Sequence, residues 1–117
     1  MGKHVVCRVE ELPPGAQRVV NVDGRAILVL NAGGAYRAVR DSCPHQGAPL
    51  SAGTVGGTMV PSAPHEYVYG LEGCIIRCPW HGLEFDLATG RSLADPDRLR
   101  VKVYSLTVDS GALVLES

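Results

Sequence analysis

The sequence predicts an all-β protein, a sandwich or small barrel of short antiparallel strands. Three observations support this prediction. The 14 glycines and 8 prolines are spread along all 117 residues, apolar residues occur in runs of about four to six, and turn-forming residues separate these runs. No window of about ten or more residues has the 3.6-residue period of an amphipathic helix. The length fits a single domain over residues 1–117.

Short apolar runs predict the strands in chain order. They cover His4 to Val9, Arg18 to Val22, Ala26 to Leu30, Tyr36 to Val39, Glu66 to Leu71, Cys74 to Arg77, Leu83 to Asp86, Val101 to Leu106 and Ala112 to Leu115. Turns that tolerate a positive φ are expected at Asp23-Gly24, Ala32-Gly33-Gly34 and Asp109-Ser110-Gly111. Two polar stretches, about 41–53 and 78–86, contain irregular segments that are expected to form loops.

Charge and hydropathy exclude some classes of partner. The chain has 11 Lys and Arg against 12 Asp and Glu, a formal net charge of −1, and these residues are interspersed. This pattern argues against a nucleic-acid partner. No stretch approaches the roughly 18 to 20 apolar residues that cross a bilayer, and Met1 to Val6 lacks the apolar region of a signal peptide. We therefore expect a cytoplasmic protein with no membrane partner.

The cysteines at positions 7, 43, 74 and 78 are enough for two disulfides. A reducing compartment instead favours metal binding by some of these thiols. Cys7 and Cys74 fall within predicted strands and are expected to be core residues.

The remaining cysteines lie in the two loops, each close to a histidine. The first loop contains Cys43-Pro44-His45-Gln46-Gly47, and the second contains Cys78-Pro79-Trp80-His81-Gly82. Zinc fingers usually pair Cys with Cys and His with His, whereas each of these segments is mixed. A structural zinc module with a Cys2His2 site stays open. The alternative is a pair of irons, one bound by both cysteines and the other by both histidines.

These two segments, with Phe85-Asp86 after the second, resemble the motif of the Rieske family. The resemblance covers nearly the whole chain. It implies an antiparallel Rieske-type β-sandwich with a small cluster-binding sub-domain at one tip, and one 2Fe-2S cluster per chain. By this resemblance Cys43 and Cys78 hold the inner iron, while His45 and His81 hold the outer iron near the surface.

Charge explains what such a ligand set would do. An oxidised 2Fe-2S core of charge +2 is neutralised by two thiolates and two neutral imidazoles, so an added electron meets less opposition than with four thiolates. Rieske centres accordingly have potentials of roughly −150 to +300 mV, against about −400 mV for plant-type ferredoxins. Rieske proteins of respiratory complexes carry a disulfide and two hydroxyl donors at positions that are here Ala48, Trp80, Leu83 and Phe85. We therefore expect a potential near the lower end of the Rieske range.

The resemblance also implies a function. The expected protein is a Rieske-type ferredoxin, a one-electron carrier between a flavoprotein reductase and a terminal oxygenase or similar redox enzyme. It would not be an enzyme by itself, and no catalytic residue is proposed. Two alternatives stay open: a small Rieske-like subunit of an assimilatory nitrite reductase, and the structural zinc module.

Two further segments are less specific. The 32 residues between His45 and Cys78 are about twice the usual gap in small Rieske ferredoxins. The surplus lies at about 54–69, where Gly56-Gly57 and the prolines 61 and 64 are expected to break regular structure. This insertion is either a docking element or, slightly favoured, a tolerated surface insertion. The segment Ser92 to Leu99 resembles a loop that covers the cluster through Pro96, or it is an ordinary surface turn.

Overall fold

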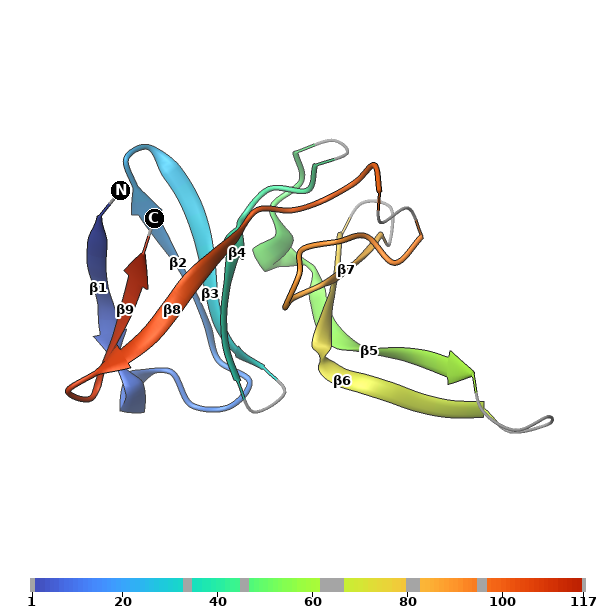
Figure 1. Cartoon of the computed structure of the whole chain (residues 1–117), viewed down its shortest axis with the longest axis horizontal. Helices are drawn as coiled ribbons and strands as arrows, with labels where there is room; N and C mark the ends of the chain where they lie inside the picture. The colour runs from blue at the N-terminus through green and yellow to red at the C-terminus, as the bar shows by residue number, and fades with distance from the viewer. Residues whose placement is uncertain are drawn as a thin grey trace.

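The computed structural model describes residues 2–32, 35–44, 47–61, 67–79, 83–94 and 97–116. Within these ranges the predicted all-β fold is confirmed (Figure 1). The strands are β1 (Lys3–Arg8), β2 (Gln17–Val22), β3 (Arg25–Ala32), β4 (Ala35–Arg40), β5 (Thr54–Pro61), β6 (Tyr67–Arg77), β7 (Glu84–Asp86), β8 (Val103–Asp109) and β9 (Ala112–Glu116). Single 3-10 turns, η1 (Val9–Glu11) and η2 (Leu50–Ala52), follow β1 and precede β5. No helix in the described part of the chain is long and apolar enough to span a bilayer.

The larger sheet contains six strands in the order β1-β9-β8-β4-β3-β2, with every neighbouring pair antiparallel. Two of the predicted turns join neighbours in this sheet. Asp23 and Gly24 have φ values of 52° and 80°, and Ser110 and Gly111 have 51° and 80°. Two successive positive φ values match the right-handed twist of the flanking strands, so these turns favour tight hairpins. Gly33 and Gly34 of the third predicted turn lie outside the described residues.

Strand β3 is buried on both faces and separates two hydrophobic cores. Ile27 and Val29 lie in one core, whereas Leu28 and Leu30 lie in the other, as the alternation of a strand requires. We call the first the body core, and its residues come mainly from the six-stranded sheet. Its members are Cys7, Leu12, Val22, Ile27, Val29, Ala38, Tyr104, Leu113 and Leu115. We call the second the loop-side core: Leu28, Leu30, Ala32, Val39, Cys43, Ala48, Leu50, Ile76, Cys78, Phe85, Leu87 and Val101.

The smaller sheet has the order β5-β6-β7 and corrects one prediction. Residues 54–61 were expected to lack regular structure, but they form β5, which pairs with β6 in a long hairpin. Gly56 pairs with Ile75, but Thr58, two residues later on β5, pairs with Gly70, which lies five residues away from Ile75 on β6. The Gly-Gly pair therefore marks an irregularity within a ladder, where glycine is common, instead of the end of a strand. The two strands predicted over 66–77 are one strand, β6.

The hairpin extends away from the six-stranded sheet (Figure 1). Its base lies beside the second loop, because Thr54 pairs with Arg77, the residue before Cys78. The hairpin thus begins at the end of the first loop and ends at the start of the second, whereas the predicted insertion, about 54–69, ends at Tyr69, which pairs with Met59 within the hairpin. Residues 62–66 at its far end lie outside the described residues.

Candidate metal centre

The first loop leaves β4 and closes on itself around Cys43. The backbone N–H of Cys43 donates to the carbonyl of Ala48 at 2.8 Å, and the N–H of Gly47 donates to the carbonyl of Cys43 at 2.8 Å. Gly47 has φ of 76°, which an L side chain rarely adopts. Gly47 thus supplies the sharp turn that brings the chain back to Cys43.

A side-chain clasp, formed by Asp41 and Ser51, joins the two ends of this loop. The Ser51 N–H donates to Asp41 Oδ1 at 2.6 Å, and the Ser51 hydroxyl donates to Oδ2 at 2.8 Å. Gln17 Nε2 on β2 donates to the Ser51 carbonyl at 2.8 Å. Charge-assisted bonds to both carboxylate oxygens fix the separation of the loop ends. This clasp was not predicted from the sequence, although the polar pair flanks Cys43 and His45 in the chain.

The second loop repeats the closure of the first. The N–H of Cys78 donates to the carbonyl of Leu83 at 2.8 Å, so in both loops the cysteine bonds to the residue five positions later. Gly53 allows the two loops to approach each other, because a Cβ at this position would collide with the backbone carbonyl of Arg77. The end of the first loop is therefore packed against the start of the second.

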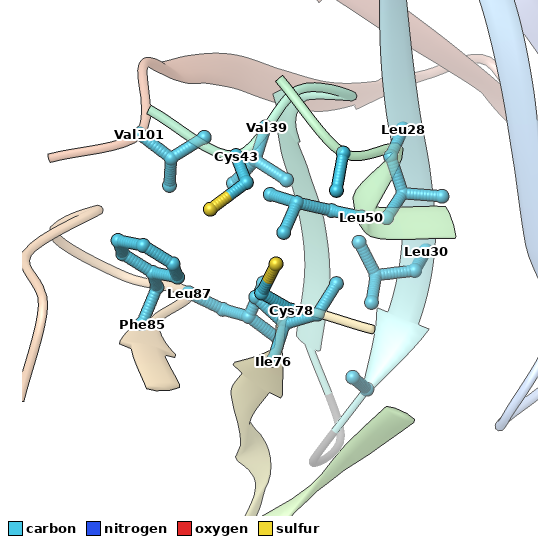
Figure 2. Packing of buried hydrophobic residues seen from close by; sticks show 12 residues of the cluster. Leu28, Leu30, Val39, Cys43, Leu50, Ile76, Cys78, Phe85, Leu87 and Val101 are labelled. Carbon is cyan, nitrogen blue, oxygen red and sulfur yellow. The ribbon is translucent and has the colours of Figure 1, made fainter. Parts of the chain in front are cut away.

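The two loops bring Cys43 and Cys78 into the loop-side core. Each cysteine is 2% exposed. Figure 2 shows the two sulfur atoms directed into the same space from opposite sides, with Phe85 and Val101 beside it. Residues 43 and 78 are far apart in sequence, and the fold brings their side chains together in one core.

A third segment closes the site on the Val101 side. Leu99 packs against the loop-side core, Val101 lies within it, and the Val101 N–H donates to the carbonyl of Gly90 at 2.8 Å. The N–H of Ser92 donates to the carbonyl of Leu99 at 3.0 Å, which joins the ends of the segment predicted to cover the cluster. Val101 and Lys102 were predicted as the start of a strand, but β8 begins at Val103. Pro96 lies outside the described residues.

His45, Trp80 and His81 also lie outside the described residues. Their positions in the chain still place them within the two closed loops: His45 between Cys43 and Ala48, and His81 between Cys78 and Leu83. No disulfide involves Cys7, Cys43 or Cys78. Cys7 is buried in the body core, as predicted, whereas the side chain of Cys74 is not described.

The described residues fit the sulfur-bearing end of an iron–sulfur site. Two thiols enter one apolar space from separate loops, and Ala48, Phe85 and Leu87 around them are fully buried. A buried thiolate is costly unless it is paired or coordinates a metal. Two such thiols in one space are therefore suited to share a metal, and the imidazoles expected to complete the ligand set come from the same two loops.

Comparison with known proteins gives the same assignment. A family model described as Rieske [2Fe-2S] domain matches residues 2–105. The chain is 33% identical over 107 residues to Ferredoxin CarAc of Metapseudomonas resinovorans, covering 91% of this chain and 85% of that protein. It is 30% identical to the 3-phenylpropionate/cinnamic acid dioxygenase ferredoxin subunit of Photorhabdus laumondii, covering 98% and 94%.

The fold also matches solved structures. A chain of a complex of reduced oxygenase and oxidized ferredoxin in carbazole 1,9a-dioxygenase superposes with a TM-score of 0.74 at 29% identity, covering 97% of this chain and 91% of that chain.

Proposed function

Because the chain belongs to the Rieske [2Fe-2S] domain family, we propose that it is a one-electron carrier of the ferredoxin type. One 2Fe-2S cluster per chain supplies the chemistry, which is the storage and release of a single electron. Cys43 and Cys78 hold one iron, and His45 and His81 hold the other. The protein has no catalytic residue of its own, since its partners perform the chemistry.

One observation carries this proposal: the two thiols enter a single buried space from loops closed by the same hydrogen bond. Isolated core cysteines would not require matching loops on both sides of that space. The mixed Cys-and-His composition of each loop disfavours the structural zinc module, and the family's cofactor does so independently.

The residues around the thiols control the environment of the electron. Ala48 and Phe85 are both fully buried and apolar. Neither provides the sulfur bridge or the hydroxyl donor that raises the potential in respiratory relatives of this family. The reduced state therefore receives less hydrogen-bond stabilisation from these positions, and we keep the prediction of a potential near the lower end of the Rieske range.

The proposed partners are a flavoprotein reductase as donor and a terminal oxygenase, or a similar redox enzyme, as acceptor, in the cytoplasm. Support comes from relatives named as ferredoxins or ferredoxin subunits of dioxygenases. A small-subunit role in an assimilatory nitrite reductase would use the same site with a large sirohaem-containing partner. Purification from its own cells distinguishes the two, because only the subunit stays bound to such a partner.

Composition and a reductive titration test the carrier role. The purified protein should be red-brown, with about two irons and two acid-labile sulfides per chain, and it should take up about one electron per chain. A colourless protein with about one zinc per chain would contradict the proposal. Uptake of no electron by an iron-loaded protein would contradict the carrier role while leaving the cofactor in place.

A further inference from the structure

The segment that closes the site has two different faces. Leu99 and Val101 face the loop-side core, which contains Cys43 and Cys78. The alternate residues Arg100 and Lys102 are exposed, and so is Arg98 in the turn that precedes them. In an extended segment, alternate side chains point to opposite sides. The cationic face is therefore the outer surface of the same segment whose inner face packs on the proposed ligands.

Two more cations extend this face through backbone pairing. Arg40 lies beside Lys102, since its N–H donates to the Lys102 carbonyl at 2.9 Å. Arg91 and Arg100 are partners in an isolated antiparallel bridge. The side chains of Arg40 and Arg91 are exposed. We call this set the basic strip: Arg40, Arg91, Arg98, Arg100 and Lys102.

No cation of the basic strip forms an ion pair with a described carboxylate. The ion pairs of the described part of the chain join Arg8 to Glu10, Arg18 to Glu11 and Arg77 to Glu84.

Three described acids neighbour the strip, against its five cations. Asp41 follows Arg40 and bonds to Ser51, and Asp86, which accepts a bond from the Ala88 N–H, pairs through its own N–H with the Arg91 carbonyl. Asp97 is exposed next to Arg98, and Asp95 lies outside the described residues. The outer face of residues 98–102 therefore carries an excess of positive charge.

The strip places like charges next to each other. Arg91 lies opposite Arg100 in their bridge, and Arg40 lies beside Lys102, and like charges directly opposite each other are destabilising. The chain as a whole has a net charge of −1, so the strip opposes the overall sign. A local concentration of charge opposite to the net charge orients an approaching partner and raises its rate of association.

We propose that the basic strip is the docking surface for an acidic face on the protein that accepts the electron. This proposal rests on the proposed carrier function. The acceptor is chosen over the donor because a chain of this fold occurs in a solved complex of oxygenase and ferredoxin. Complementary charge would bring the acceptor against the segment that contacts the cysteine-bearing core.

Oxidation of the reduced protein by small charged complexes tests the strip without a purified partner. Hexacyanoferrate(III), an anion, stands in for an acidic acceptor, and hexaammineruthenium(III), a cation, is its counterpart. Each complex takes one electron from the reduced protein and becomes the corresponding divalent-metal complex, with no proton transferred. Stopped-flow rates would be measured from low to high ionic strength.

Overall charge and local charge predict opposite results. The chain has a formal net charge of −1, and the oxidised centre with its two thiolates and two neutral imidazoles adds none. The added electron therefore gives the reduced protein a net charge of about −2. If overall charge controlled the encounter, the rate with the anion would rise with salt. The basic strip predicts a rate that falls roughly threefold to tenfold as salt is added, with the reverse trend for the cation.

A matched pair of variants assigns the effect to the strip. Arg98→Gln combined with Arg100→Gln, and Lys3→Glu on the distant edge strand β1, both change the net charge by two units. We expect the double variant to lose most of the salt dependence with the anion, and Lys3→Glu to retain it. Should the double variant lose its iron, Arg91→Gln combined with Lys102→Gln replaces it.

Three results would overturn the proposal. The first is a wild-type oxidation rate with the anion that rises with salt, and the second is the same salt dependence in the double variant and in Lys3→Glu. The third is strip-dependent binding to phosphatidylserine vesicles at physiological salt. The last result would make the strip a membrane contact. A protein without any reducible centre would instead overturn the proposed function, which the same samples reveal in their visible spectrum before any oxidant is added.

Discussion

The two cores on either side of β3 show how the fold and the site are stabilised differently. Apart from Leu12, the body core is filled by strand residues, Tyr104 and Leu113 among them, that paired strands hold in place. The loop-side core includes residues from loops, and the thiols of Cys43 and Cys78 lie among its aliphatic and aromatic side chains. The body core thus follows from strand pairing, whereas the loop-side core depends on a few loop hydrogen bonds and on the group that the thiols bind.

Removing one cysteine from each core should give the largest difference. Cys78→Ala is expected to reduce bound iron at least tenfold, because a thiolate ligand is lost and metal binding contributes to the folding of such sites. Cys7→Ala is the matched control, since Cys7 is also buried, at 7% exposed, but in the body core. It should keep full iron. Equal iron contents in the two variants would contradict the division between the cores.

Truncating a leucine in each core separates an effect on stability from an effect on iron retention. Leu50 and Leu113 are both fully buried, so Leu50→Ala and Leu113→Ala should each lower the free energy of unfolding by about 2–4 kcal/mol. Only Leu50→Ala should also accelerate iron release to a chelator, because Leu50 belongs to the core that contains the cysteines. Iron release at the same rate from both variants would mean that the two cores contribute equally to iron retention.

The clasp should have an intermediate effect confined to the first loop. Ser51→Ala removes one side-chain bond and is expected to lower the free energy of unfolding by about 1 kcal/mol. Asp41→Ala removes both acceptors and should lower it by about 2 kcal/mol, with faster iron release. Ser105→Ala, at an exposed position on β8, is the control in chemical denaturation. A clasp variant that releases iron as slowly as this control would show that the clasp does not support the site.

The smallest effect is expected from the exposed ion pair next to the body core. The hydrogen bond from Arg8 lowers the pKa of Glu10. The pair therefore adds stability above the unfolded-state pKa of Glu10 and loses it as the pH falls through the lower folded-state pKa. Both side chains are largely exposed, so Glu10→Gln should leave the unfolding midpoint at neutral pH unchanged within error. A shift of the unfolding midpoint as large as that of Ser51→Ala would mean that this ion pair stabilises the protein as much as the clasp does, contrary to our expectation.

Local chemistry made much of the body predictable from the sequence. Asp23-Gly24 and Ser110-Gly111 adopt positive φ as their residue types favour, and the apolar runs between such turns are strands. The β5–β6 hairpin was missed at β5 because Gly56-Gly57 signals a break locally, whereas pairing across the hairpin accommodates the irregularity. Long-range pairing of this kind leaves little trace in a short window of sequence.

The site was predictable in a similar, partial way. The two mixed loops identified Cys43 and Cys78, and the structure brings both into one core. The Asp41–Ser51 clasp and the close approach at Gly53 were not identified, because both depend on how residues distant in sequence meet. The basic strip was also missed. Its charges are spread over positions 40 to 102, and only strand pairing gathers them on one face.

Pulsed electron paramagnetic resonance of the dithionite-reduced protein tests whether two sulfurs and two nitrogens bind the iron pair. We expect couplings to a pair of imidazole nitrogens, with one nitrogen lost, or the whole signal abolished, in each of His45→Ala and His81→Ala. A reduced signal without strongly coupled nitrogen, or a nitrogen signal that persists unchanged in both variants, would contradict this ligation.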